Sequence, residues 1–243
     1  MKVVKIGGNV VDNEDLLAQF CMQFAALEGP KVLIHGGGVM ASRMQEKTGI
    51  PPRMAGGRRI TDDATLQIVT MVYAGWCGKH ICASLQALGC NAISLSGCDA
   101  DVIRASRRPP IAVEGEMVDF GHVGDVRSGS VNADALRRLL DAGFVPVLNA
   151  INHDGNAHLL NTNADTVASA VAAALGAELI ICFEKPGVLL DKDDDASLLR
   201  ELNSAKYREL LSEGRIAGGM LPKLENAFKV LAAGVPKVVI QHS

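Results

Sequence analysis

Short apolar runs alternate with segments of helical periodicity along the whole chain. Compact hydrophobic runs predict buried strands at residues 3–6, 31–34, 91–96, 145–149, 179–183 and 237–240. The stretches between them predict helices over 14–28, 39–48, 61–89, 133–142, 163–175, 204–213 and 221–233. This alternation predicts an α/β fold, in which a mostly parallel sheet carries helices on both faces. Ligands of such sheets bind at the carboxyl ends of the strands.

The stretch 61–89 is the longest predicted helix and is apolar on nearly all sides. Thr61 or Asp62 is suited to cap its start, and Gly89 is suited to close its end. A helix with so wide an apolar surface is buried in a core or in a subunit interface. Residues 101–130 are rich in basic, proline and glycine residues, and predict a hairpin with loops.

A glycine cluster follows each of the first two strands. The first reads KIGGN over residues 5–9, and the second reads HGGG over residues 35–38. Glycine lets the backbone turn sharply and brings bare N–H groups close to an anion, and a following helix adds positive partial charge. The two clusters therefore predict a site for a highly charged anionic centre, such as a phosphoryl group in transfer. Neither matches the P-loop or the dinucleotide glycine fingerprint, which argues against both classes.

Charge and length narrow the functional classes. The 243 residues allow one large domain or two small lobes, and 24 basic against 27 acidic residues give a net charge of −3. This balance offers no electrostatic case for binding nucleic acid or an anionic membrane. The N-terminus lacks signal-peptide character, and no apolar run reaches the ~20 residues that cross a bilayer. We therefore expect a cytoplasmic protein.

The cysteines and histidines predict neither disulfides nor a metal site. The chain has six of each, without C-x-x-C, H-x-x-x-H or H-E-x-x-H spacing. We expect the thiols to be reduced and buried, and no zinc to be held by the protein. The acidic run 191–195 lacks the glycine and the distal glutamate of an EF-hand loop, so we interpret it as a solvated loop.

Three groups of polar residues are candidates for chemistry. Lys5 ends a hydrophobic strand, where a lysine is costly to bury unless it meets an anion; the alternative is an edge strand with the lysine in solvent. Residues 161–165 read NTNAD at the start of an Ala-rich helix. One N-cap needs only one such residue, so the surplus predicts a site, and Asn161 and Asp165 share a face if the turn is helical.

Two further groups carry positive charge. Lys223 follows Pro222 near the start of the helix 221–233, where a lysine is unfavourable unless an anion is present; the alternative is a solvated side chain. Arg58 and Arg59 precede the long helix, and an arginine there can bind a carboxylate with two hydrogen bonds. The alternative for these arginines is a surface loop that contributes only solubility.

Taken together and in order, these motifs resemble the amino acid kinase family. The resemblance runs from residue 3 to about residue 235 and is carried by KIGGN, HGGG, GRRITD, NTNAD and GGMLPKLENA, and by GHVG at 121–124. It is closest to the branch that phosphorylates the γ-carboxylate of N-acetyl-L-glutamate, in a version similar to that of Bacteroidetes-type bacteria. The resemblance implies a three-layer αβα sandwich with an acyl-glutamate lobe over 1–174 and an ATP lobe over 175–243. It also implies ATP with Mg²⁺ carried by the nucleotide phosphates.

The resemblance assigns roles to individual residues. Lys5 and Lys223 match the lysines that stabilise the transferring phosphoryl group, and Asp165 matches the aspartate that orients them. Gly7 and Gly8 match phosphate-binding residues. The substrate-binding matches are Gly37, Gly38, Arg59 and Asn161. The ATP-binding matches are Glu184, Lys185, Gly187, Leu189, Ile216 and Gly219, with residues 215–217 completing the pocket.

The departures from the family pattern bear on regulation and specificity. The chain ends soon after residue 240, which implies a smaller ATP lobe, and it lacks the N-terminal helix of the arginine-inhibited, hexameric members. We expect a homodimer that pairs through the helix 61–89. Because some members use N-succinyl intermediates, Arg58 is a candidate partner for a second carboxylate. The alternatives are a different kinase of the family, a non-catalytic amino-acid sensor of the same fold and, more remotely, an NAD-dependent dehydrogenase.

Overall fold

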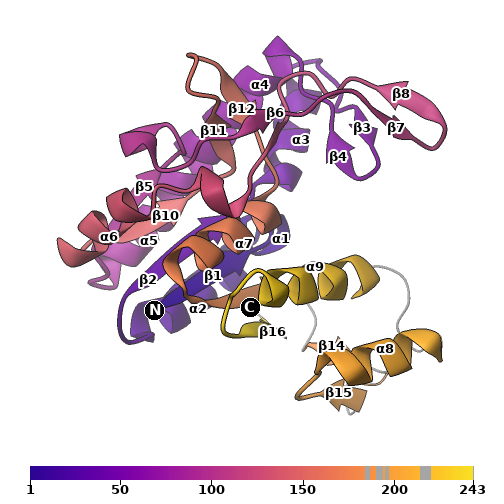
Figure 1. The fold of residues 1–243 in the computed structure, drawn as a ribbon. Coiled ribbons are helices and arrows are strands. Elements are labelled where there is room, and N and C mark those ends of the chain that lie inside the picture. The colour runs from indigo at the N-terminus through magenta and orange to yellow at the C-terminus, as the bar shows by residue number, and fades with distance from the viewer. Residues whose placement is uncertain (184–186, 190–193, 195–196, 214–219, 243) are drawn as a thin grey trace.

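A six-stranded parallel sheet forms the centre of the molecule (Figure 1). The computed structural model describes residues 1–183, 187–189, 194, 197–213 and 220–242. In the order of the sheet the strands are β16 (Val238–His242), β13 (Glu178–Phe183), β1 (Lys2–Ile6), β2 (Lys31–His35), β10 (Val145–Leu148) and β5 (Ala92–Leu95). Every neighbouring pair runs parallel, which confirms the α/β prediction.

The strand order reverses between β1 and β13. From β1 the chain continues through α2 (Glu14–Ala26) to β2 on one side, whereas β13 continues through α9 (Met220–Ala232) to β16 on the other. At such a reversal the connecting segments leave toward opposite faces and open a crevice at the carboxyl ends of the strands. Lys5 lies on β1 beside this crevice, on an interior strand, so the edge-strand alternative for Lys5 is wrong.

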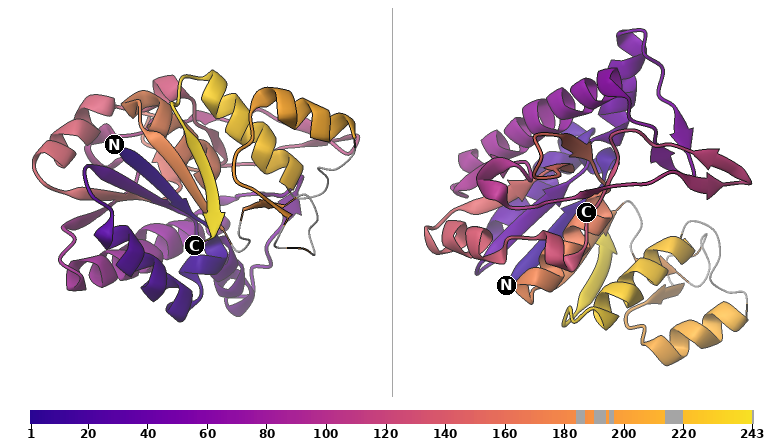
Figure 2. Two further views of the ribbon diagram at one scale, coloured as in Figure 1. Left: turned by 90° about the horizontal axis from the view of Figure 1, so that it is seen from below. Right: turned by 45° about the horizontal axis from the view of Figure 1, so that its top comes forward.

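Helices cover both faces of the sheet, as the two views of Figure 2 show. One core contains Val4 and Ile6 of β1 and packs against α2 and the long helix near residues 68–85. The other core contains Val3 and packs against α6 (Ala133–Asp141), α7 (Ala164–Leu175) and α9. Because side chains alternate along a strand, Lys5 shares a face with Val3 and points toward the α7 side.

The long helix forms as predicted but contains a π-helical segment. Asp62 caps α4 (Asp63–Thr70) by accepting a hydrogen bond from Thr65 N. The π-helical turns span Met71–Cys77 (η1) and lead directly into α5 (Gly78–Ala87). Such insertions occur often at functional sites, because they shift the side chains that follow onto a different face.

The remaining elements are short and lie around the ends of the sheet. The further helices are α1 (Gly8–Val11), α3 (Gly38–Lys47) and α8 (Ser204–Ser212), with 3₁₀ turns at Asp99–Asp101 and Ser128–Ser130. The antiparallel pairs are β3 (Met54–Ala55) with β4 (Arg58–Arg59), β6 (Ser106–Arg107) with β9 (Gly124–Asp125), β7 (Ile111–Val113) with β8 (Glu116–Val118), β11 (Ile151–His153) with β12 (Leu159–Asn161), and β14 (Val188–Leu189) with β15 (Leu198–Leu199). The region 101–130 therefore contains a hairpin, as predicted, nested within a second antiparallel pair.

The cysteines are reduced, and five of the six are buried. Burial raises the pKa of the Cys21, Cys77 and Cys82 thiols to about 11, which keeps them protonated. Cys98 is exposed, so the expectation of burial is wrong for this residue. Within the described part of the chain, no helix has the length and apolar character needed to cross a membrane.

Candidate functional site

The two glycine clusters meet at the carboxyl ends of β1 and β2. A Cβ atom built on Gly8 would lie 3.5 Å from Gly38 N and 3.7 Å from Val39 N, and one built on Gly36 would lie 3.9 Å from Gly8 N. The backbone N–H groups that open α3 therefore lie beside those that open α1. Since Gly8 has no side chain, nothing from this residue covers the first amides of α3, which stay accessible to an anion.

The long helix packs against the second glycine cluster, residues 35–38, which forms the glycine turn at the end of β2. A Cβ atom on Gly37 would lie 2.7 Å from the Tyr73 ring and 3.2 Å from Cys77 Sγ, both of which belong to the π-helical segment. Burial raises the pKa of the Tyr73 hydroxyl, and the nearby Arg59 guanidinium opposes this shift. The ring is thus a neutral support for this glycine cluster, and a side chain at position 37 would force the ring to shift.

Lys5 and Asp165 form an ion pair near the carboxyl end of β1. Lys5 Nζ lies 2.8 Å from Asp165 Oδ1, with the lysine side chain 14% and the aspartate side chain 46% exposed. β1 supplies the lysine, and the first turn of α7 supplies the aspartate. The pair holds a mostly buried ammonium group at the strand-order reversal, where its remaining N–H groups can meet an anion.

The three polar residues within 161–165 perform three different tasks. Asn163 caps α7, because its side-chain oxygen accepts hydrogen bonds from Asp165 N and Thr166 N. Asn161 lies in β12, buried, and donates from Nδ2 to Thr61 Oγ1 at 3.1 Å. Asn161 ends a strand and Asp165 lies in a helix, so the turn between them is not helical and the condition for a shared helical face is not met. Of the two residues beyond the cap, Asn161 lines the cavity described below and Asp165 pairs with Lys5; that they form a functional site stays a prediction.

Arg59 is buried, and the surface-loop alternative is wrong for it. Its side chain donates to Gln45 Oε1, to Gly38 O at 3.0 Å and to Ser42 Oγ at 2.9 Å. Arg58, on the same strand β4, is half-buried; burial and the neighbouring Arg108 lower the pKa of its guanidinium, and Asp125 opposes the shift.

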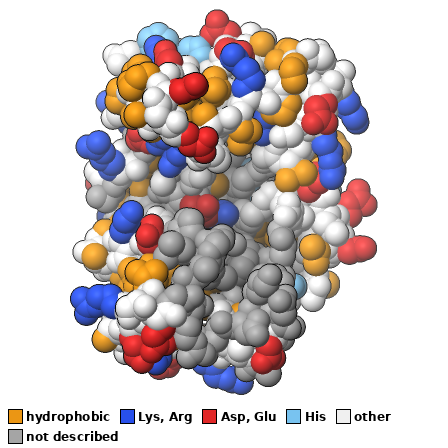
Figure 3. Space-filling model, turned by 90° about the vertical axis from the view of Figure 1, so that its right-hand side faces the viewer, with side chains coloured by type: hydrophobic (Ala, Val, Ile, Leu, Met, Phe, Trp, Pro, Cys, Tyr) orange, Lys and Arg blue, Asp and Glu red, His pale blue; other side chains and the backbone are white. Residues whose placement is uncertain are grey.

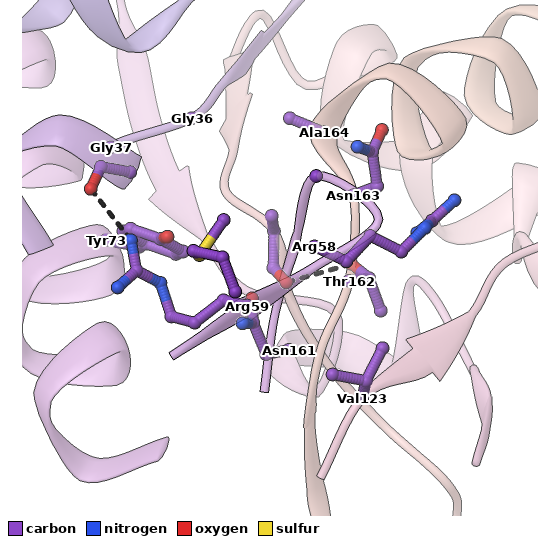
Figure 4. A pocket seen from close by; sticks show the side chains of 14 residues that line it. Gly36, Gly37, Arg58, Arg59, Tyr73, Val123, Asn161, Thr162, Asn163 and Ala164 are labelled. Atoms are coloured by element: carbon purple, nitrogen blue, oxygen red, sulfur yellow. Dashed lines mark hydrogen bonds between the residues drawn. The ribbon is translucent and has the colours of Figure 1, made fainter. Parts of the chain in front are cut away.

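A cavity of about 210 Å³ joins these residues. Figure 4 shows Arg58, Arg59 and Asn161 on its walls with the glycine turn and Tyr73. The full lining is Gly36, Gly37, Gly38, Met54, Gly57, Arg58, Arg59, Tyr73, Val123, Ala150, Asn161, Thr162, Asn163 and Ala164. A pocket with arginine side chains, backbone N–H groups and amides suits a small anionic substrate.

His35 lies directly beneath the glycine turn and is fully buried. Its Nδ1 lies 2.7 Å from Gly36 O, and no partner is present for Nε2 among the described residues. Desolvation lowers the pKa of the imidazole to about 4, so it is neutral near pH 7. In that state Nδ1–H donates to the Gly36 carbonyl and fixes the start of the turn.

The predicted ATP-binding residues are only partly covered by the structure. Lys223 falls in the first turn of α9, near the positive end of a helix as expected, but its side chain lies outside the described residues. Glu184, Lys185, Ile216 and Gly219 also lie outside them. Leu189 is in β14, and Gly187 directly precedes that strand.

On the face seen in Figure 3, acidic and basic side chains are interspersed over the described residues.

Two residues at or beside the candidate site, Tyr73 and Gln45, could not be identified from the sequence pattern. Tyr73 reads as one more apolar position of the long helix, because periodicity does not reveal the π-helical insertion. Gln45 reads as a polar position of an amphipathic helix, yet its side chain is fully buried. Both were missed because their roles depend on neighbours that are distant in the sequence.

Comparison with known proteins identifies the family. The family model described as "Amino acid kinase family" matches residues 1–242. The chain belongs to the amino acid kinase family. One curated member is the acetylglutamate kinase of Parabacteroides distasonis, which is 48% identical over 245 residues that cover 99% of this chain and 93% of the relative.

Solved structures of the amino acid kinase fold agree with the described sheet. A Streptococcus mutans protein is 28% identical, with a TM-score of 0.76 over 99% of this chain and 94% of that one. A Giardia carbamate kinase is 15% identical, with a TM-score of 0.67 over 99% of this chain and 92% of that one. The latter likeness establishes the fold alone. The predicted family and fold are thereby confirmed.

Proposed function

We propose that this protein is an acetylglutamate kinase. It transfers the γ-phosphoryl group of ATP to the γ-carboxylate of N-acetyl-L-glutamate and forms N-acetyl-L-glutamyl 5-phosphate, a step of arginine biosynthesis. The proposal rests chiefly on the Lys5–Asp165 ion pair, which lies beside the two glycine clusters and near a cavity lined by Arg59 and Asn161. The curated relatives that carry this name match nearly the whole chain, which supports the proposal.

The proposed acceptor determines what the residues need to do. A carboxylate is ionised at pH 7, so the reaction needs no general base, only positioning and charge neutralisation. Lys5 stabilises the transferring phosphoryl group, Asp165 orients Lys5, and the N–H groups near Gly7, Gly8, Gly37 and Gly38 bind oxygens that gain charge. Arg59 and Asn161 bind the α-carboxylate of the substrate.

We place ATP over the lobe 175–243, with Lys223 as the second lysine. Gly187, Leu189 and the other predicted ATP-binding residues hold the nucleotide there. Among the described residues no group of three or more His, Cys, Asp or Glu side chains gathers as a metal site. In our proposal Mg²⁺ arrives on the nucleotide phosphates and neutralises their charge. The cytoplasmic location stays a prediction from the sequence.

The test is a substrate panel with two readouts. ADP release is measured with ATP and magnesium on N-acetyl-L-glutamate, N-succinyl-L-glutamate and free glutamate, and hydroxylamine traps the acyl phosphate. We expect turnover of the acetylated substrate and its loss in Lys5→Ala and Lys223→Ala. Folded protein that turns over none of the three would contradict the proposal and favour the sensor alternative.

The same panel tests the succinyl alternative. Arg58 lines the cavity and lies near Arg108 and Asp125, so it is the candidate partner for a second carboxylate. Preference for the succinylated substrate that is lost in Arg58→Leu would support this role. An Arg58→Leu variant with an unaltered ratio of the two activities would exclude it.

We also propose that the protein is a homodimer paired through the long helix. Met71 is 62%, Trp76 60% and Leu88 44% exposed along that helix, and Met22 of the neighbouring α2 is 56% exposed. Several large apolar side chains left exposed on one helix and its neighbour are typical of an interface. A helix with so wide an apolar surface is buried in a core or in a subunit interface, and these side chains of it are left exposed in the single chain.

A further inference from the structure

We propose that Gln45 is a positioning residue for substrate, which orients the Arg59 guanidinium and leaves its positive charge available to the α-carboxylate. This inference rests on the proposed function, in which Arg59 binds that carboxylate. Gln45 itself does not line the cavity; it acts through Arg59.

The contact is built deep within the fold. Gln45 lies in α3 with 0% of its surface exposed, and Arg59 of β4 is 8% exposed. An Arg59 Nη1–H group donates to Gln45 Oε1, while Gln45 Nε2 donates to Thr65 Oγ1 at 3.1 Å. Both ends of the buried amide are thus satisfied, so the amide has one favourable orientation and holds the guanidinium in one plane.

The hydrogen-bond chain has a fixed direction. An arginine side chain has only N–H donors, so the amide oxygen of Gln45 must face Arg59. The amide nitrogen then faces Thr65 Oγ1, which accepts its hydrogen bond. Thr65 lies in the first turn of α4, where its backbone N donates to Asp62 Oδ1 at 2.9 Å. Thr65 therefore holds the far end of the amide whose oxygen binds Arg59.

The positive charge of Arg59 is not compensated by these acceptors, because all of them are neutral. Besides Gln45, its side chain donates to Gly38 O and Ser42 Oγ, and no carboxylate pairs with it among the residues the structure describes. A buried guanidinium without a counterion is costly, so the site is arranged for an anion that arrives from outside. A glutamate at position 45 would keep the shape of the side chain. Its carboxylate would pair with Arg59 and compensate the positive charge before a substrate binds.

The experiment compares Gln45→Glu and Gln45→Met with Glu46→Gln, a charge change of the adjacent, exposed residue. Steady-state kinetics are measured on N-acetyl-L-glutamate and on its α-amide, which lacks the α-carboxylate. In Gln45→Glu we expect KM for the acid to rise roughly 10- to 100-fold, with kcat and KM for ATP within about twofold, because the α-carboxylate interaction is equal in ground and transition states. For the α-amide we expect no rise.

Gln45→Met keeps a similar volume without an acceptor, so we expect a smaller rise in KM, about threefold to tenfold. It also carries the test if Gln45→Glu fails to fold. Equal KM values in the Gln45 variants and Glu46→Gln would overturn the inference, and so would an equal rise for the acid and the α-amide. Wild-type protein that turns over no acylated glutamate would overturn the proposed function and this inference with it.

Discussion

At the scale of single residues, burial distinguishes the two cations of the candidate site from cations in exposed ion pairs. Lys5 and Arg59 are mostly buried and hydrogen-bonded, whereas Arg53 and Arg104 form exposed ion pairs. Exposed pairs contribute little to stability, because solvent screens them. A buried cation at the carboxyl end of a parallel sheet instead marks the place where charge is to be neutralised.

Lys5 and Asp165 are expected to differ in the size of their effects. Lys5→Gln removes the cation that meets the phosphoryl group in the proposed reaction, and we expect kcat to fall by roughly 10³-fold or more. Asp165→Asn keeps the lysine but loses its orientation, so we expect a smaller fall, about 10- to 100-fold. Single-turnover kinetics with thermal melts of both variants measure this. A larger loss in Asp165→Asn would mean that the aspartate contacts the reacting groups itself.

At the scale of elements, the π-helical segment decides where the glycine turn sits. It places the Tyr73 ring against Gly37 on one side, while Trp76 of the same segment is exposed on the other. A regular α-helix would not direct these residues in the same way. One short segment therefore supports the candidate site and contributes to the proposed interface.

The close contact between Gly37 and the π-helical segment can be tested by adding a methyl group at position 37. In Gly37→Ala the new methyl group would lie 2.7 Å from the Tyr73 ring, so we expect a loss of about 1–3 kcal/mol in the free energy of unfolding. Tyr73→Leu makes room, and the double variant should lose less than the sum of the single variants. Urea unfolding of the four proteins measures the coupling. Additive losses would show that the two residues do not press on one another.

At the scale of the whole molecule, His35 links stability to pH. Its pKa is about 4 in the folded protein against an ordinary value of 6.5, because burial disfavours the charged imidazole. As the pH falls below 6.5, the unfolded chain binds a proton that the folded chain does not. The stability contribution is therefore present above pH 6.5 and is lost progressively toward pH 4.

Between pH 7.5 and pH 5.5 this effect amounts to about 1 kcal/mol of unfolding free energy. Asparagine does not titrate. We therefore expect the unfolding free energy of His35→Asn to fall by about 1 kcal/mol less than that of the wild type over the same pH interval. Urea unfolding at both pH values provides the comparison. Identical pH dependence in the two proteins would show that other groups cause the acid sensitivity.

Assembly is the second property of the whole molecule. We expect Trp76→Glu to convert a dimer into a monomer, since a charge in an apolar interface is costly to desolvate. Met117→Glu is the matched control, because Met117 is 70% exposed on β8, on another part of the surface. Light scattering coupled to size exclusion reports the mass. A monomeric wild type, or a dimeric Trp76→Glu, would exclude pairing through this helix.

The sequence by itself determined the family, the six strands of the parallel sheet and the longer helices, but not short pairs such as β11–β12. Apolar runs and helical periodicity are local properties, so these six strands and the longer helices were predicted with ends shifted by only a few residues. The glycine turns and Lys5 could be predicted for the same reason. A glycine run or a lysine near the end of an apolar strand can be recognised from the local sequence, without knowing which residues contact it in the fold.

The tertiary structure alone decided which side chains meet. The pairs Lys5 with Asp165, Gly37 with Tyr73, and Arg59 with Gln45 join segments that are distant in the sequence, and no local pattern specifies them. The strand order brings β1 beside α7, and the π-helical segment turns Tyr73 inward. Sequence pattern reports what each segment prefers, but burial and hydrogen bonding between segments determine which polar groups are left to face a ligand.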